Sequence, residues 1–214
     1  MTEEIKTVAR RHLAVDGANL SLRAVARDLG MASSAVYRYF ASRDELLTAL
    51  IIDAYDSVGS AAEQAAEGVT GHTDRLVAVG HAVREWALAE PYQWALIYGS
   101  PVPGYQAPQD TIGPATRVIL LIVAIVRDAF GAGAVTVGPP ITGRYAEELS
   151  AVAAQFGQEI PAQLVGATLA AFVHLCGAVS SELFGQLNQS VDDDRRGFFE
   201  FQMRGAAQLI GLTD

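Results

Sequence analysis

Residues 21–47 gather the side chains best suited to recognise another molecule through hydrogen bonds. The segment reads SLRAVARDLGMASSAVYRYFASRDELL, and hydroxyl, phenol and guanidinium groups lie close together at Ser33, Ser34, Tyr37 and Arg38. A serine hydroxyl bonds to base edges or phosphates, and a guanidinium forks onto guanine or phosphate. A tyrosine ring contacts a thymine methyl or bonds to a phosphate. This set of residues therefore indicates contacts to a nucleic acid.

Two short helices joined by a glycine would present these side chains. Ser21 is a good N-cap for the first helix, and Gly30 can take the left-handed conformation that ends it. The first helix has an apolar stripe at helical spacing, formed by Leu22, Val25, Ala26 and Leu29. The second helix is predicted over residues 32–40. A capping box then begins a further helix, with Ser42 as the cap and Glu45 accepting from the Ser42 N–H. This order is the helix-turn-helix pattern, whose second helix enters the DNA major groove.

The segment resembles the N-terminal DNA-binding domain of the TetR (tetracycline-repressor) family of bacterial transcription regulators. The resemblance is carried by Ala24–Ala26, Gly30, Ala35–Phe40 and Ser42–Leu47. It implies an all-α fold, in which an N-terminal three-helix helix-turn-helix domain is joined to a larger helical-bundle domain for effector binding and dimerisation. Many members carry a lysine or another strong donor early in the recognition helix. This chain has Ala-Ser-Ser at residues 32–34, which leaves the operator sequence open.

Eight residues are the predicted DNA contacts: Ser21, Arg23, Ser33, Ser34, Tyr37, Arg38, Tyr39 and Arg43. The resemblance assigns Tyr39 to a phosphate. Ser21, Arg23 and Arg43 lie at helix starts, where free N–H groups favour an anion. Two alternatives stay open at this point. Either tyrosine could pack in the domain core instead, and the three arginines could be plain surface charges.

The net charge of −9 is unevenly distributed along the chain. Residues 1–50 hold seven basic and six acidic residues, which leaves +1, whereas residues 51–214 hold eight basic and eighteen acidic residues, which leaves −10. Because an acidic surface repels the phosphate backbone, the protein is expected to dock on DNA through its N-terminal end. A solvated surface alone would explain the same asymmetry.

The composition favours a globular cytoplasmic protein. Half of the 214 residues are apolar, enough for a sizeable core. The longest unbroken apolar run, residues 118–126, is nine residues long and too short for a membrane span. The N-terminus is charged and lacks an apolar secretory core. The single cysteine, Cys176, excludes an intrachain disulfide and is expected in the core.

The chain is predicted to be helical almost throughout, with a DNA-binding domain at 1–50 and a ligand-binding and dimerisation domain at 51–214. Irregular loops are expected at 99–108 and 131–143, where glycine and proline cluster. Besides the two short helices, helices are expected at about 2–16, 42–67, 73–89, 112–130, 142–156, 161–184 and 192–212, with a new helix start at Pro91.

The C-terminal domain shows no catalytic or metal-binding motif. Its histidines lack metal-ligand spacing, and GxGxxG, P-loop and GxSxG patterns are missing. The acidic triplet 192–194 is better explained by the N-terminus of a helix than by a metal. The chain is therefore not expected to be an enzyme or to hold a cofactor or metal.

An effector pocket is expected in the aromatic part of this domain. The stretch WALAEPYQWALIYGSPVPGY resembles a segment of the WHG-like subgroup of TetR-family effector domains. A mostly apolar pocket with a few polar groups would hold a small apolar or amphipathic molecule. The predicted ligand contacts are Trp86, Trp94, Tyr98, Tyr105, Arg117 and His174, with His81 and Tyr145 as further polar candidates. Ordinary core packing is the alternative for each of them.

The last two helices carry signs of dimerisation. Small residues recur over 162–178, and the final helix holds Phe198, Phe199, Phe201, Met203 and Leu209, which exceed one buried stripe. An isologous four-helix contact between two copies would bury this surface, as the resemblance also implies. Packing within one chain is the alternative. A homodimer would read a near-palindromic operator.

These features together predict a ligand-responsive, DNA-binding transcriptional regulator. By the resemblance, it is a repressor that binds its operator as a dimer and is released by its effector. Two rival interpretations remain: a helical small-molecule-binding protein or enzyme without DNA-binding activity, and a helical interaction module that has lost DNA binding.

Overall fold

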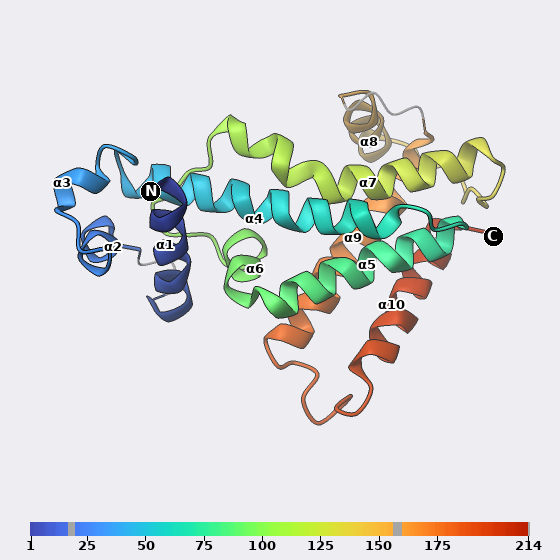
Figure 1. Ribbon diagram of the computed structural model, residues 1–214. Coiled ribbons are helices and arrows are strands. Elements are labelled where there is room, and N and C mark those ends of the chain that lie inside the picture. Colours follow the sequence, from blue (N-terminus) through green and yellow to red (C-terminus); the bar gives the residue numbers. More distant parts are fainter. Residues whose placement is uncertain (17–19, 156–159, 214) are drawn as a thin grey trace. The chain divides into compact units, whose positions relative to one another are not determined.

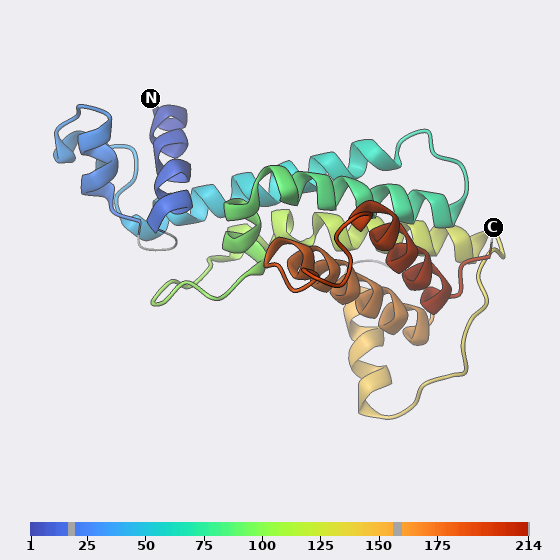
Figure 2. The same ribbon diagram turned by 90° about the horizontal axis from the view of Figure 1, so that it is seen from below.

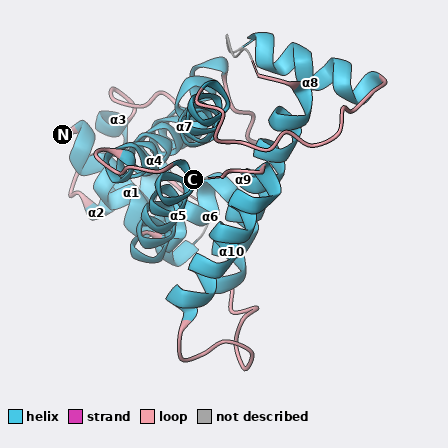
Figure 3. Ribbon diagram, turned by 90° about the vertical axis from the view of Figure 1, so that its right-hand side faces the viewer, coloured by secondary structure: helices cyan, strands magenta, loops and turns pink. Residues whose placement is uncertain are grey.

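The computed structural model describes residues 1–16, 20–155 and 160–213 (Figure 1). The predicted all-α class is confirmed, because the described residues form helices and no strand beyond one isolated antiparallel bridge between Val135 and Leu212 (Figure 3). The elements are α1 Thr2–Asp16, α2 Leu22–Asp28, α3 Ser33–Val36, α4 Arg43–Ala66, α5 His72–Ala89, α6 Pro91–Tyr98, a 3₁₀ turn Gln109–Thr111, α7 Ile112–Gly131, α8 Arg144–Gln155, α9 Ala162–Leu183 and α10 Arg195–Ile210.

The chain divides into two compact units. The N-terminal unit comprises Met1–Ser57 and Ala89–Thr116, and the C-terminal unit comprises Val58–Leu88 and Arg117–Asp214. The N-terminal unit thus contains α1, α2, α3 and α6 with the first parts of α4 and α7.

An apolar cluster packs the helices of the N-terminal unit together. It contains Ile5 of α1, Val25 of α2, Val36 of α3, Leu46 and its neighbours on α4, and Val102 from the loop after α6. Outside the apolar cluster, two cations of α1 bind one carboxylate of α4: Lys6 Nζ lies 2.8 Å and Arg10 Nη2 2.6 Å from Asp53 Oδ2. These contacts fix α1 on α4.

The capping residues behave largely as the sequence predicts. Gly30 has φ of 66°, in the left-handed region, and Ser21 Oγ accepts from the Ala24 N–H at 3.5 Å. Ser42 Oγ accepts from the Glu45 N–H at 3.1 Å. The reciprocal bond differs from the expected one, because Glu45 Oε2 accepts from the N–H of Ala41 at 2.5 Å rather than from that of Ser42.

The second short helix is shorter than predicted. Regular α3 covers only Ser33–Val36, and residues 37–39 form turns. The reason lies in the hydrogen bonds, since Arg38 N bonds to Ala35 O and Tyr39 N to Val36 O, each over three residues rather than four. Phe40, not Tyr39, turns inward.

In the C-terminal unit, α9 and α10 lie side by side (Figure 2), and α8 packs on α9. Phe199 and Met203 of α10 are buried in the core. By length and composition α9 could cross a membrane, the one helix in the described part of the chain that could; the central helix of a bundle has the same character. Cys176 on α9 is half-buried rather than a core residue, and its partial burial raises the pKa of the thiol to about 12.

Some helix boundaries of this unit differ from the prediction, and the loop after α7 is irregular as predicted. The last helix begins at Arg195 rather than 192, because Asp194 caps it by accepting from the Gly197 N–H at 2.8 Å. The expected end of the α8 helix, Phe156, lies outside the described residues. The loop after α7 is tied to the C-terminal segment, with Thr136 N bonded to Gly211 O at 2.7 Å.

Candidate nucleic-acid interface and ligand cavities

Residues 33–40, which contain α3, have apolar side chains on the buried side and polar side chains on the exposed side. Val36 and Phe40 point into the core, whereas Ser33, Ser34 and Arg38 are exposed. Tyr37 and Tyr39 are 45% and 42% exposed, so neither of them is a core residue. The exposed side therefore presents hydroxyl, phenol and guanidinium groups to the solvent, where they could reach DNA.

The flanking candidates lie at the starts of the neighbouring helices. Ser21 and Arg23 are exposed at the start of α2, and the Ser21 hydroxyl already caps that helix. Arg43, the first residue of α4, is half-buried, and its Nη1 lies 3.2 Å from Asp44 Oδ1. Its charge is thus partly compensated within the chain.

A cavity of about 500 Å³ lies within the N-terminal unit, and we call it the α4–α6 cavity. Its walls come from α4, α6, the loop that follows α6 and the first turn of α7. The largest side chains that line it are Ile51, Tyr55, Leu96, Ile97, Tyr105 and Ile112. None of the residues that line it carries a charge.

The large hydroxyl-bearing side chains of this cavity bond to other groups of the protein. Tyr55 Oη donates to the carbonyl of Ile97 at 3.1 Å, and Tyr105 Oη lies 2.8 Å from Thr48 Oγ1. Thr111 Oγ1 donates to the carbonyl of Pro108 at 2.7 Å. The cavity wall is therefore uncharged, and the hydroxyls of its two tyrosines are already bonded within the protein.

An aromatic cluster stands behind this wall. Tyr55 meets the ring of Tyr98 edge-on, with the centroids 5.9 Å apart. The ring of Tyr98 in turn lies 4.4 Å from that of Trp94, which is fully buried. The cluster supports the position of Tyr55 in the wall.

The six predicted ligand contacts do not line one cavity, and His174 is exposed on α9. Tyr105 lines the α4–α6 cavity, and Trp94 and Tyr98 lie in the cluster behind it. Trp86 is half-buried on α5 in the C-terminal unit. In the same unit, Arg117 forms a bidentate pair with Glu63, at 3.0 and 2.6 Å. Of the further polar candidates, His81 has both ring nitrogens buried in the C-terminal unit, whereas Tyr145 is exposed on α8.

Sequence reasoning missed the α4 residues of this region, Thr48 and Tyr55. Their signal is present but faint: both interrupt an apolar stretch of α4, and they stand seven residues apart, on one face of the helix. Nothing local relates them to the loop after α6.

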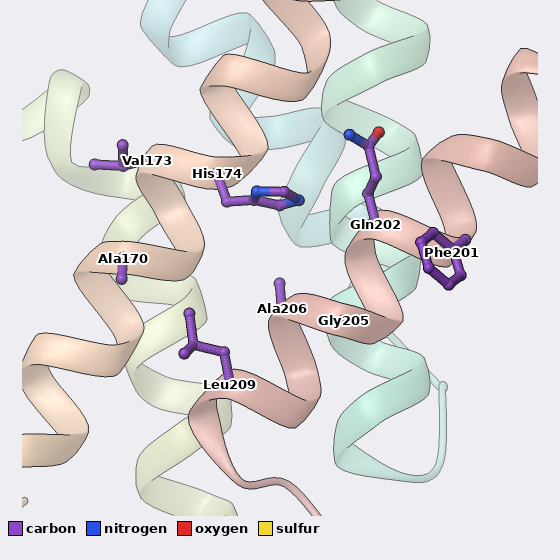
Figure 4. Close-up of a pocket in the computed structure, with 8 residues that line it drawn as sticks. All are labelled: Ala170, Val173, His174, Phe201, Gln202, Gly205, Ala206 and Leu209. Carbon is purple, nitrogen blue, oxygen red and sulfur yellow. The ribbon is translucent and has the colours of Figure 1, made fainter. Parts of the chain in front are cut away.

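A shallow apolar groove runs between α9 and α10 (Figure 4). Its eight lining residues are Ala170, Val173, His174, Phe201, Gln202, Gly205, Ala206 and Leu209. Figure 4 shows His174 directed from α9 towards α10. Phe201 is 73% exposed, and the space beside Gly177 and Gly205 is open. Of the five apolar residues predicted to exceed the core, Phe199 and Met203 are instead buried within the chain.

Comparison with known proteins agrees with this geometry. Residues 5–50 match the family model of bacterial regulatory proteins of the tetR family, and residues 76–206 match that of the tetracyclin repressor-like C-terminal domain. The chain is similar to the HTH-type transcriptional regulators Rv1816 of Mycobacterium tuberculosis and Mb1846 of Mycobacterium bovis. Identity to each is 40% over 210 residues, which cover 94% of this chain and 88% of each relative.

Solved structures give the same result. The crystal structure of regulatory protein SCO4313 matches with a TM-score of 0.78 at 34% identity, over 97% of this chain and 95% of that one. A protein from Rhodococcus sp. RHA1 matches with a TM-score of 0.71 at 26% identity, over 95% and 94% of the two chains. The chain therefore belongs to the TetR family, and it is a DNA-binding transcriptional regulator.

Proposed function

We propose that the protein is a cytoplasmic, dimeric repressor that leaves its operator when a small apolar or amphipathic effector binds. The observation that carries the DNA-binding part is the exposed row of Ser33, Ser34, Tyr37 and Arg38 above the buried Val36. Residues 1–50 would form the DNA-binding domain, and residues 51–214 a ligand-binding and dimerisation domain of the WHG-like subgroup.

The roles of the DNA contacts follow from their chemistry. Arg38 would fork onto a guanine or a phosphate, and Tyr37 would contact a thymine methyl or a phosphate. Ser33 and Ser34 would bond to base edges. Ser21, Arg23, Tyr39 and Arg43 would bind phosphates on either side and so fix the register of the protein.

The groove between α9 and α10 supports the dimer. A second copy of the same two helices would cover Val173, Phe201 and Leu209, which one chain leaves exposed. Such an isologous contact would place two recognition segments on successive major grooves of a near-palindromic site. An effector shifts this dimer away from the operator only if it binds the released conformation more tightly.

Fluorescence anisotropy with a duplex from the intergenic region upstream of the gene tests the recognition segment. Arg38→Ala and Tyr37→Ala should each weaken binding by roughly ten- to a hundredfold, since a good base contact is worth about 1–3 kcal/mol. Arg144→Ala, which removes an exposed arginine of α8, is the matched control and should bind as the unaltered protein does. Unchanged affinity in the Arg38 and Tyr37 variants would refute the assignment.

A further inference from the structure

We infer that the α4–α6 cavity binds an uncharged, mostly apolar ring compound, and that the occupant acts on the DNA-binding helices through the contact between Tyr105 and Thr48. The inference rests on the proposed ligand response and assigns to it a site, a ligand class and a route. The cavity wall is uncharged, and the loop after α6 forms part of it.

Moving a charged ligand from water into this uncharged cavity would cost free energy. No side chain that lines the cavity is ionised, and the hydroxyls of Tyr55, Tyr105 and Thr111 bond to protein groups. A charged ligand would lose its hydration without gaining an oppositely charged partner, whereas an apolar one gains from leaving water. A volume of about 500 Å³ lies within the usual range for small-molecule sites.

The wall also favours a ring. Tyr55 and Tyr105 come from different elements, α4 and the loop after α6, and both line the cavity. Aromatic rings prefer offset or edge-on contact with one another. A flat ligand between α4 and this loop would meet at least one of the two tyrosines in that way.

The loop after α6 belongs to the cavity and to the core of the DNA-binding helices at once. Val102 lines the cavity and is also part of the buried cluster that holds Val25, Val36 and Leu46. Tyr105 packs against the same cluster. The Tyr105 N–H donates to the Val102 carbonyl at 3.1 Å, across a turn in which Gly104 has φ of 78°. Displacing this turn would therefore move both residues together.

One hydrogen bond connects this turn to the start of α4. Thr48 Oγ1 donates to the carbonyl of Asp44 at 2.9 Å, so its only hydroxyl hydrogen is used. In the 2.8 Å contact with Tyr105, the phenol must then be the donor. Asp44 in turn pairs with Arg43, a proposed phosphate contact. A ligand that pushes the turn away from α4 would break this bond close to the DNA.

The binding step can be tested with two fluorescent probes that share one ring system. N-phenyl-1-naphthylamine is neutral, and 8-anilino-1-naphthalenesulfonate carries a charge. The neutral probe should bind saturably, and the sulfonate at least about tenfold more weakly. Ala115→Phe fills the cavity from α7 and should lower the affinity for the neutral probe at least about tenfold. Ala151→Phe, at an exposed position of α8, is the matched control. Equal affinity in the Ala115 variant and the unaltered protein would overturn the assignment of the cavity, whether or not the protein binds DNA.

The coupling step has its own readout. The saturating neutral probe should weaken binding to the upstream duplex at least about threefold in the unaltered protein, and not in Ala115→Phe. Tyr105→Phe keeps the ring but removes the donor. It should itself weaken DNA binding by about two- to tenfold, and Thr48→Val should add nothing to it in the double variant. If the neutral probe weakens DNA binding as much in Tyr105→Phe as in the unaltered protein, the proposed route through Tyr105 and Thr48 is refuted. Failure of the unaltered protein to bind any duplex would instead refute the proposed function, with the probe titration still deciding on the cavity.

Discussion

At the scale of single residues, a buried ion pair links the helices of the C-terminal unit. Arg84 of α5 and Glu182 of α9 are both buried, and their two hydrogen bonds are each 2.6 Å long. The Arg84 guanidinium also lies 5.7 Å from the ring centre of Phe199 on α10. The pair thus joins three helices, and each ion depends on the other for compensation.

Glu182→Leu should lower the free energy of unfolding by about 3–5 kcal/mol, because it leaves a buried guanidinium without its partner. The double variant Arg84→Met with Glu182→Leu should lose much less. Urea denaturation at fixed protein concentration measures both. Glu148→Gln in the exposed pair with Arg144 is the control, with an expected cost below about 1 kcal/mol. A Glu182 variant as stable as that control would contradict the account.

His81 of α5 is expected to make the stability of the fold depend on pH. Neither ring nitrogen has a hydrogen-bond partner, and burial is the main cause that holds its pKa below the usual 6.5. Arg196 and Arg84 lower the pKa further, against the opposing carboxylates of Glu200 and Glu85. The unfolded chain therefore binds the proton more readily than the folded one, so this group leaves stability unchanged above pH 6.5 and lowers it as the pH falls through the lower, folded pKa.

Replacing the imidazole removes this dependence. His81→Leu should unfold at a melting temperature that falls less between pH 7.5 and pH 5.5 than that of the unaltered protein, as measured by thermal denaturation. An equally steep fall in both proteins would assign the pH dependence to other groups.

At the scale of elements, local patterns predicted most helices. The start and end of α1 agree with the prediction because one apolar face recurs along it, and the Gly30 turn is set by a conformation that glycine favours. The early end of α3 could not be predicted, since the apolar pattern of residues 32–40 does not reveal that Arg38 and Tyr39 bond over three residues rather than four. The cavity could not be predicted either. Its contacts join Tyr55 to Ile97 and Thr48 to Tyr105, 42 and 57 residues apart, which only tertiary packing brings together.

The exposed face of α9 and α10 yields a prediction at the same scale. Light scattering at micromolar concentration should give twice the chain mass of 22.7 kDa, and Phe201→Asp should shift the mass towards that of one chain, because a charge cannot be buried at an apolar contact without a partner. Tyr92→Asp, at an exposed position of α6, is the control and should stay dimeric. A single-chain mass for the unaltered protein would refute the dimer.

At the scale of the whole molecule, charge limits how the protein can approach DNA. Residues 51–214 carry a net −10 and residues 1–50 only +1, so affinity must come from a few well-placed contacts rather than from a basic surface. In the proposed dimer, two copies would supply twice as many such contacts. The acidic remainder should disfavour non-specific binding and sharpen the difference between the operator and other DNA.

The most direct test of the central claim is selection of binding sites from a random-sequence duplex library by the purified protein. The account predicts enrichment of one near-palindromic sequence, with two half-sites that each engage one recognition segment. The double variant Tyr37→Ala with Arg38→Ala should not enrich it. A protein that enriches no sequence, or that enriches the same one without these two side chains, would contradict a regulator that reads DNA through residues 33–39.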